Sequence, residues 1–423
     1  MAKLLLISLR DPFLDNDRVM PPMGVMALNS FILGHGYASH IENDFDLENI
    51  RKYEDYTHFG ISCMTPEKEQ AYAVLRAIKE RFPQKTVVIG GPHAQHYLDE
   101  CIARPFDHIV RGDGEHALLE IIRGKAGQQR ILNLPVTEEE MNEMPLPYRE
   151  PAFLNQYSFH FQGVRATTIL TAKGCPMACK FCEDARSNVK LYTPENIGGQ
   201  IADAKKAGYQ GVMFFDDIFS LSMKRVHALA SEISKHGIYY RCFGHAKSMT
   251  EEMAKVLSDS GCLETGFGAE SGSQRILDIS GKKTTVKQNR LFIETCNKFG
   301  IKVKAFIILG LPSEDRETVS ETVEFLKFLI GNRFRNKFGK EITNDFDLTI
   351  YFPYKGTQIR DSMDRNENKY DLILTQNPDT MSGFYKGKGG KAEVAVRTSK
   401  LSGGELEEIQ RSLLAEFKPR VIA

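Results

Sequence analysis

The stretch "ATTILTAKGCPMACKFC", residues 166–182, joins an apolar, β-branched run to three closely spaced cysteines. The apolar run predicts a buried strand. Cys175, Cys179 and Cys182 are then expected in a loop at the carboxyl end of that strand. Three cysteines are one short of the usual set for a zinc site or an iron–sulfur cage. Either a fourth ligand lies elsewhere, or one coordination position is open.

Two simpler interpretations of the cysteines are weaker. Their spacing would place them on one helical face as a core stripe, but Gly174 and Pro176 disfavour a helix interior there. A zinc site completed by a histidine such as His245 would usually pair its cysteines two residues apart, and only one of the two gaps is that short. An iron–sulfur cubane takes thiolates from one looping segment, and an open iron would bind and activate a small molecule.

The apolar run opens a series of alternating strands and helices. Strands are expected at residues 166–172, 211–215, 238–243, 262–269, 302–310 and 345–352, and helices at 195–207, 222–236, 250–259, 285–299 and 314–330. Six strand–helix repeats predict a partial or complete βα barrel, whose chemistry lies at the carboxyl ends of the strands.

The residues before the barrel show a second strand–helix rhythm. Strands are expected at 4–8, 58–62, 86–90 and 107–111, and helices at 22–35, 66–81 and 94–101. The predicted fold is therefore α/β: a Rossmann-like doubly wound domain, then a TIM-type βα barrel of about six strands and a short tail. The predicted boundaries are 1–130 for the first domain, 131–163 for a proline-rich linker, 164–355 for the barrel and 356–423 for a C-terminal extension with a terminal helix.

The charge balance and the length of the apolar runs limit the partners and the cellular location that we expect for this protein. Lysine plus arginine equals aspartate plus glutamate at 55 each, which gives no reason to expect nucleic acid as a partner. No run approaches the roughly 20 apolar residues of a membrane span, and the apolar start is too short for a signal peptide. We expect a cytoplasmic protein, in which clustered cysteines bind metal more often than they form disulfides. Five scattered cysteines are expected as core thiols: Cys63, Cys101, Cys242, Cys262 and Cys296.

The cysteine spacing, with Phe181 directly before the last cysteine, resembles that of the radical S-adenosylmethionine (SAM) enzymes. In that family three cysteines hold a 4Fe–4S cluster, and the open iron chelates SAM for reductive cleavage to a 5′-deoxyadenosyl radical. Three further segments at strand ends resemble the family: "FFDDIFS" (214–220), "GFGAESGSQRIL" (266–277) and "FIILGLPSED" (306–315). The resemblance implies SAM contacts from Phe181, Asp216, Asp217, Glu270, Ser271, Gly310 and Pro312.

Several of these residues also have ordinary structural interpretations. An aspartate after a strand often caps the next helix, and glycine with proline often forms a tight turn. Glu270 follows an apolar strand, where an unpaired charge is costly, so a purely structural role explains it poorly. In "RCFGHAKSM" (241–249) one subgroup of radical SAM enzymes frequently has an arginine near position 245. His245 and Lys247 are both candidates to replace it, and an ordinary histidine whose hydrogen bonds are satisfied within the protein is the alternative.

The first domain resembles the cobalamin-binding domain that precedes the barrel in one radical SAM subgroup. Its landmarks are "PPMGVMALNSFILGHGY" (21–37), "GISCMT" (60–65), "VVIGGPHA" (87–94) and "HIVRGDGEHALLEI" (108–121). The implied cobalamin contacts are Met23, Gly24, Ser62, Thr65, Gly90, Gly91, Pro92, Gly112, Gly114 and Glu115.

The motif Asp-x-His-x-x-Gly, which supplies a histidine to cobalt in many cobalamin proteins, is absent. Many members of the subgroup also lack it and resemble proteins that hold cobalamin without a protein ligand on its lower face. A degenerate domain that no longer binds cobalamin is the alternative. His93 and His116, which lie in the cofactor-like loops, are candidate functional residues.

The resemblance implies an enzyme that transfers a methyl group to an unactivated carbon of a small molecule. It also implies an electron donor such as flavodoxin or ferredoxin. The same scaffold performing a cyclisation, rearrangement or oxidation, with or without cobalamin, stays open. A methylthiotransferase for transfer RNA would need three more cysteines in the first domain, which has only Cys63 and Cys101. A zinc protein with a ligand-sensing first domain is the non-enzymatic alternative.

Overall fold

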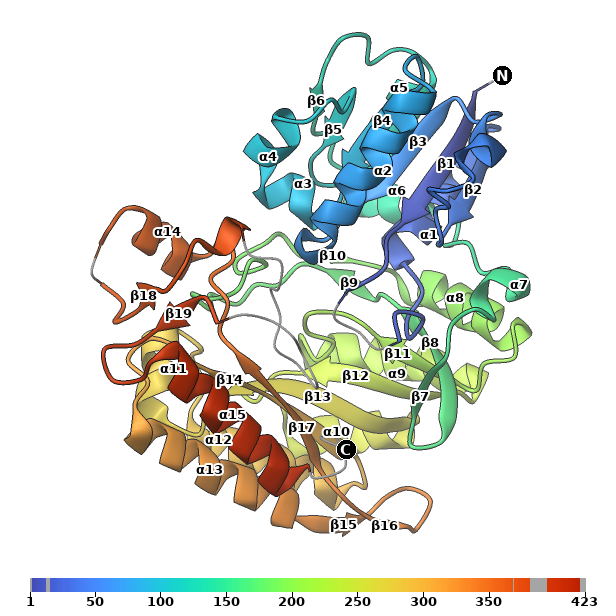
Figure 1. Ribbon diagram of the computed structural model, residues 1–423. Coiled ribbons are helices and arrows are strands. Elements are labelled where there is room, and N and C mark those ends of the chain that lie inside the picture. The colour runs from blue at the N-terminus through green and yellow to red at the C-terminus, as the bar shows by residue number, and fades with distance from the viewer. Residues whose placement is uncertain (1, 13–15, 368, 381–393, 419–423) are drawn as a thin grey trace. The chain divides into compact units, whose positions relative to one another are not determined.

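The computed structural model describes residues 2–12, 16–367, 369–380 and 394–418. The chain divides into two compact units, Met1–Ser158 and Phe159–Ala423 (Figure 1). In the described residues, no helix combines the length and the apolar character that a membrane crossing requires.

The first unit is an open parallel sheet in the order β2-β1-β3-β4-β5-β6. Its strands are β1 (Lys3–Ser8), β2 (Ala38–Glu42), β3 (His58–Ser62), β4 (Thr86–Gly90), β5 (His108–Val110) and β6 (Ile131–Leu132). The principal helices are α1 (Met23–Gly34), α2 (Lys68–Arg81), α3 (Pro92–His96), α4 (Leu98–Ile102) and α5 (Glu115–Ile122). The order reverses at β1, which places a topological switch point between β1 and β3, where such sheets bind ligands.

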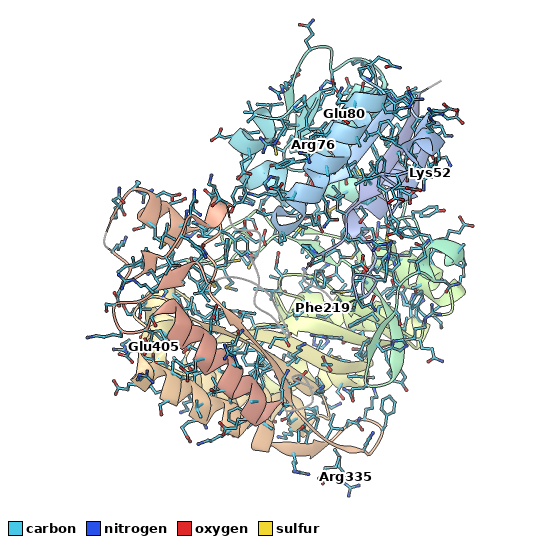
Figure 2. The ribbon with its side chains drawn as sticks, in the orientation of Figure 1. Lys52, Arg76, Glu80, Phe219, Arg335 and Glu405 are labelled. Carbon is cyan, nitrogen blue, oxygen red and sulfur yellow. The ribbon has the colours of Figure 1, made fainter. Side chains whose placement is uncertain are left out.

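Both faces of this sheet are buried. Leu5 and Ile7 of β1 pack in one core cluster with Phe59, whereas Leu4 and Leu6 pack in the other. This alternation follows from the two-residue period of a strand. The outer surface of α2 carries Arg76 and Glu80, which point away from the sheet (Figure 2). The doubly wound fold is therefore confirmed.

Residues 131–163 differ from the predicted linker. They contain β6, α6 (Glu138–Glu143), α7 (Pro151–Leu154) and β7 (Phe159–Phe161). The segment up to residue 158 belongs to the first unit, where β6 extends the sheet and Leu132 and Leu154 are buried. Its prolines are compatible with this structure because Pro151 stands in the first turn of α7.

The second unit is a curled half-barrel in the order β17-β14-β13-β12-β11-β8-β7. Its parallel strands are β8 (Val164–Ile169), β11 (Gly211–Phe214), β12 (Tyr239–Gly244), β13 (Cys262–Glu270), β14 (Lys302–Leu309) and β17 (Asp345–Ile350). These six strands neighbour one another in chain order, and β7 pairs antiparallel with β8. The six predicted strands are confirmed as a partial barrel.

The helices between these strands begin at residues suited to a helix start. Each of the five helices α8 (Pro194–Lys206), α9 (Met223–His236), α10 (Glu251–Asp259), α12 (Val286–Lys298) and α13 (Arg316–Gly331) has a side chain that accepts a backbone N–H bond at its N-cap. The capping residues are Thr193, Ser222, Thr250, Thr285 and Asp315. Such caps satisfy donors that a helix start leaves unbonded. The short helix α11 (Gln274–Ser280) follows β13 and was not predicted.

The C-terminal extension covers part of this barrel. It contains α14 (Gln358–Asp364), β18 (Ile373–Leu374), β19 (Val396–Arg397) and α15 (Gly403–Phe417). At the start of α15, Glu405 pairs with Arg316 of α13 at 2.6 Å, and further along Gln410 donates to the Leu348 carbonyl of β17 (Figure 2). The extension is therefore fastened to the last two barrel elements.

Replacing Gly91 by alanine should destabilise the first unit by about 1–3 kcal/mol. Gly91 has φ 92° and ψ −176°, a region open almost only to glycine, and a Cβ there would lie 2.9 Å from the Cys63 carbonyl oxygen. Amide hydrogen exchange of β3 and β4 in the full chain measures the effect. Gly24→Ala is the matched control, since a Cβ at Gly24 meets nothing within 4 Å. Equal losses of protection in both variants would contradict the prediction.

Candidate functional site

The three cysteines lie in a loop at the carboxyl end of β8, as predicted. The base of the loop is closed by a two-stranded ribbon, β9 (Ala172–Lys173) with β10 (Lys190–Leu191). Inside it, the Cys175 N–H donates to Ser187 Oγ at 2.8 Å, and the Arg186 N–H donates to the Met177 carbonyl at 2.7 Å. Gly174 has φ 88°, and a Cβ on it would lie 2.2 Å from the Asn188 carbonyl oxygen, so the turn requires glycine. We call residues 174–189 the cluster loop.

The thiols of the cluster loop are sheltered from water. Cys175 and Cys179 are buried and Cys182 is half-buried. Burial is the main cause that raises the pKa of all three thiols. The pKa of Cys182 is raised to about 12, and the charges of Cys179 and Cys175 add to the rise at Cys182. Iron must therefore displace protons that these thiols hold when no metal is bound.

The arrangement of the thiols separates the two metal hypotheses. Within the described ranges, no group of three or more His, Cys, Asp or Glu side chains converges on a point where a metal ion would fit. In a 4Fe–4S cluster each cysteine binds a different iron, so three spaced thiols on one loop fit the cluster better than a single ion.

The two neighbouring aspartates after β11 have different surroundings. Asp216 is buried and accepts hydrogen bonds from the N–H groups of Thr171, at 2.6 Å, and Ala172, at 3.1 Å, and from the Thr171 hydroxyl. Burial outweighs these bonds and raises the pKa of Asp216 to about 6. Arg225 donates to the Thr171 carbonyl at 2.6 Å. These contacts fix the chain just before the cluster loop.

Asp217 is exposed at the same strand end and close enough to Cys175 to raise the pKa of that thiol. Partial desolvation, together with the charge of Asp184, raises the pKa of Asp217 to about 6. Next to it, Phe219 is buried and stacks on Phe214 with ring centroids 5.0 Å apart (Figure 2). Of the two aspartates, Asp217 is the one whose carboxylate faces outward from the protein.

A buried ion pair occupies the carboxyl end of β13. Lys282 Nζ lies 2.6 Å from Glu270 Oε1, and both side chains are less than a tenth exposed. Burial is the largest single influence and lowers the pKa of Lys282, but Glu270, Cys179 and Cys182 together outweigh it, so the pKa of the lysine is raised. Glu270 has φ 61° at an irregularity in the β13–β14 register. Such distortions cluster at functional sites.

Gly268 makes room for this ion pair. A Cβ at position 268 would lie 2.0 Å from Glu270 Oε1 and 2.6 Å from Lys282 Nζ. The pair therefore occupies the volume that a side chain on the strand would fill. The Glu270–Lys282 pair is held by the strand itself and by the return of the chain through α11.

The remaining predicted SAM residues lie at neighbouring strand ends. Ser271 is fully buried, its hydroxyl 3.1 Å from Thr322 Oγ1 of α13 and accepting the Ser273 N–H. Gly310 has φ 78° and donates its N–H to the fully buried Glu314 carboxylate, whose pKa burial raises to about 8. Pro312 is buried in the same turn. Their contacts with SAM stay predictions.

The cluster loop is tied to α11 and to the C-terminal extension. The Lys180 N–H donates to the Ser280 carbonyl at 3.0 Å, and the Lys180 carbonyl accepts the Ile359 N–H at 3.1 Å. Phe181 packs against a core cluster that includes Tyr351 and Tyr370. Phe181 therefore anchors the loop between Cys179 and Cys182.

His245 directly follows β12. It is buried, and burial, with Lys282 and Lys247 nearby, lowers its pKa to about 4, so the imidazole is neutral at neutral pH. Its Nδ1 accepts the Lys247 N–H at 3.3 Å, and its Nε2 has no hydrogen-bond partner among the described residues. His245 therefore lies directly after β12, close enough to Lys282 for the lysine charge to act on it.

The predicted cobalamin residues all lie at the carboxyl edge of the first sheet. Met23 and Gly24 begin α1 after β1, Ser62 and Gly90 end β3 and β4, and Pro92 and Glu115 begin α3 and α5. Thr65, Gly91, Gly112 and Gly114 lie between a strand and the α-helix that follows it. Gly112 is exposed with φ 72°. Thr65 and Glu115 are buried. This edge at the switch point, with little side-chain bulk, suits a large flat ligand.

Neither histidine of these loops is placed as an exposed ligand. His93 is fully buried, with Nε2 2.8 Å from the Tyr72 hydroxyl and its ring stacked on Tyr97. His116 is paired with Glu140 at 3.3 Å. The edge therefore fits cobalamin held without a histidine from either position.

Three site residues were missed from the sequence: Thr171, Lys282 and Glu314. Lys282 had the clearest signal, since a buried Glu270 demands a cation and the chain returns to it 12 residues later. Glu314 lies four residues after Gly310, whose N–H it accepts. Its sequence signal was ambiguous, because a glutamate at this position also fits the start of a helix. Thr171 had no signal beyond its position at a strand end.

Two family models match the chain, one within each unit. The model described as the radical SAM superfamily matches residues 169–326, and the model described as the B12 binding domain matches residues 18–122. The first range contains the cluster loop and the strand ends up to α13. The second contains all ten predicted cobalamin residues.

Individual relatives share about a quarter of their residues or fewer with this chain. An uncharacterized methyltransferase of Pyrococcus horikoshii is 27% identical over 391 residues, covering 84% of this chain and 80% of that protein. The anaerobic magnesium-protoporphyrin IX monomethyl ester cyclase of Rubrivivax gelatinosus is 23% identical over 347 residues, covering 73% of this chain and 62% of the cyclase. The structure of the radical SAM methyltransferase TsrM from Kitasatospora setae superposes with a TM-score of 0.72 at 15% identity, covering 100% of this chain and 90% of that one.

Replacing Lys282 by methionine should lower the free energy of unfolding of the second unit by about 3–5 kcal/mol, because it leaves Glu270 buried and unpaired. The double variant Glu270→Gln/Lys282→Met should recover most of the loss, since no buried charge is left. Amide hydrogen exchange in β13 and α11 of the full chain measures both. A double variant at least as unstable as the single one would show that the pair is not the source of the stability.

The cysteine loop, the strand ends of the half-barrel, the switch-point edge of the first sheet and the two matching family models agree with one another. The chain therefore contains a radical SAM domain and, before it, a B12-binding domain, and it is an enzyme with a 4Fe–4S cluster, SAM and cobalamin as cofactors.

Proposed function

We propose that this enzyme transfers a methyl group from SAM to an unactivated carbon of a small molecule and that the transfer depends on cobalamin. The observation that carries the proposal is the presence, in one chain, of a three-cysteine cluster loop and of a sheet edge suited to a corrin. Nitrogen, oxygen and sulfur acceptors have lone pairs that attack SAM directly. Radical chemistry is needed when the acceptor is a carbon without such a pair.

The site residues would have different roles in holding the cluster and SAM. Cys175, Cys179 and Cys182 would hold the cluster, which supplies the electron for SAM cleavage when bound. The outward carboxylate of Asp217 suits the SAM ammonium group, whereas Asp216 holds Thr171 and the base of the loop. Glu270 would bind a polar part of SAM while Lys282 balances its charge.

His245, directly after β12, also offers a group for the substrate. The neutral His245 imidazole offers Nε2, which is buried and has no partner in the part of the chain that the structure describes. A buried polar atom of this kind is costly unless a ligand satisfies it. We assign it to a hydrogen bond with the substrate or with SAM.

A second candidate function is radical cyclisation. It is favoured by the similarity to the anaerobic cyclase, which is 23% identical over 73% of this chain. The similarity to the methyltransferase of Pyrococcus horikoshii is closer and covers more of both proteins. Both reactions would use the same cluster and SAM residues, and they differ in the fate of the SAM methyl group.

Cys179→Ala should abolish formation of 5′-deoxyadenosine from SAM under reducing conditions, because one iron loses its thiolate. The matched control is Cys296→Ala, which removes a fully buried thiol of α12 that lies outside the cluster loop. The control should retain iron, sulfide and SAM cleavage. Cleavage that survives in Cys179→Ala at the level of the control would refute the ligand role.

Incubation of the reduced holoenzyme with SAM carrying a ¹³C-methyl group separates the two functions. The acceptors are the small-molecule extract of the source cells, and the measurement is carbon NMR of the products. Methyl transfer predicts a new labelled methyl group bonded to carbon, only when cobalamin is present. Label confined to methionine, together with an unlabelled cyclised product, would overturn the proposal in favour of cyclisation.

A further inference from the structure

Met64 is an exposed apolar side chain at the carboxyl edge of the first sheet. It lies two residues after the end of β3, beside the switch point between β1 and β3 (Figure 1). Met64 is 50% exposed, more than any other large apolar residue that the structure describes in the first unit. A single exposed methionine is not unusual in itself, so its backbone and its neighbours decide what it indicates.

The backbone around Met64 is fixed on both sides of the residue. Cys63 is fully buried, donates its N–H to the Gly90 carbonyl at 3.0 Å, and accepts the His93 N–H on its carbonyl at 3.0 Å. The Met64 N–H donates to Glu67 Oε2 at 2.8 Å, and the Met64 carbonyl accepts the Glu67 N–H at 3.0 Å. The outward position of the Met64 side chain is therefore set by the fold.

The segments beside Met64 carry little side-chain bulk. On one side, β4 ends in Gly90, which pairs with Ser62 of β3, and the exposed Gly112 follows β5. On the other side, a Cβ at Gly24, at the start of α1, would meet nothing within 4 Å. A flat ring can therefore approach the backbone on both sides of β3, with the Met64 side chain between it and the sheet.

Neither His93 nor His116 competes with Met64 for a metal at this edge. His93 is fully buried, and His116 forms an ion pair at 3.3 Å. Arg10, in the segment after β1, is held by two ion pairs. Met64 thus presents a thioether sulfur, which is soft and polarisable, from a fixed position at the switch point.

We propose that Met64 lies below the corrin ring of bound cobalamin and covers the cobalt from that side. A thioether is a weak ligand, and its apolar methyl group excludes water from the face that it covers. The fixed backbone of Met64 would hold the sulfur at a constant height under the ring. The inference rests on the cobalamin part of the proposed function, and it holds whether the product is methylated or cyclised.

The test replaces Met64 by histidine in the full chain loaded anaerobically with cob(II)alamin. In the EPR spectrum of cob(II)alamin, each cobalt line splits into three when a ¹⁴N atom binds below the metal. The unsubstituted protein should show no nitrogen splitting, because a thioether lies there. Met64→His should show the three lines, and ¹⁵N labelling of the histidines should reduce them to two, which identifies the nitrogen as the protein's own.

The matched control is Leu134→His. Leu134 is also a partly exposed apolar residue two positions after a strand of this sheet, but it follows β6, three strands away from β3. This variant should bind cob(II)alamin without nitrogen splitting. An unsplit spectrum for cob(II)alamin bound to Met64→His, equal splitting in the control, or nitrogen splitting in the unsubstituted protein would overturn the proposal.

A second variant decides the question if Met64→His does not retain cobalamin. Met64→Ala removes the cover without adding a ligand, so water should reach the lower face of the ring. In water enriched with ¹⁷O, the cobalt lines should broaden more in this variant than in the unsubstituted protein, and equal broadening would overturn the proposal. Loss of methyl transfer with the expected spectra would count against the proposed function alone.

Discussion

The buried ion pair of Lys282 with Glu270 is the constraint on which the site depends. Two charges cannot stay inside a protein unless they meet with good geometry, and this pair meets at 2.6 Å. The pair requires glycine at position 268, the left-handed backbone of Glu270 and the return of the chain through α11. It thereby brings a cation next to Cys179 and Cys182.

The cluster loop is held from several sides. Asp216 and Arg225 fix Thr171 at its start, and Ser280 receives the Lys180 N–H in its middle. The C-terminal extension, through Ile359 and the core cluster around Phe181, closes the outer side. Three parts of the second unit that are far apart in sequence thus set the position of the thiols. The extension beyond the barrel is therefore a structural part of the cluster site.

The strands and the cysteine loop were predictable because their signals are local. Apolar β-branched runs predict buried strands, and glycine with proline predicts the break before the cysteines. The polar strand β2 was missed because it lies at the sheet edge with exposed residues. The linker was predicted from its prolines, but a proline also fits the first turn of a helix, as Pro151 does in α7.

The parts of the site that were not predictable depend on contacts between distant segments. Asp216 and Asp217 are adjacent and chemically identical in sequence, and only the turn after β11 determines that Asp216 faces Thr171. Lys282 has no pattern of its own until β13 and α11 are in place. Lys180 and Lys369 are 189 positions apart and both lie at the Tyr370 ring, a contact that depends on the folded C-terminal extension.

The central claim is that three cysteines hold a 4Fe–4S cluster whose fourth iron is open to SAM. Mössbauer spectroscopy of the protein reconstituted with ⁵⁷Fe, before and after SAM is added, tests it most directly. The account predicts four irons per chain, one of which changes its signal when SAM binds while the other three do not. Four irons that do not respond to SAM, or a protein that takes up zinc in place of iron, would contradict it.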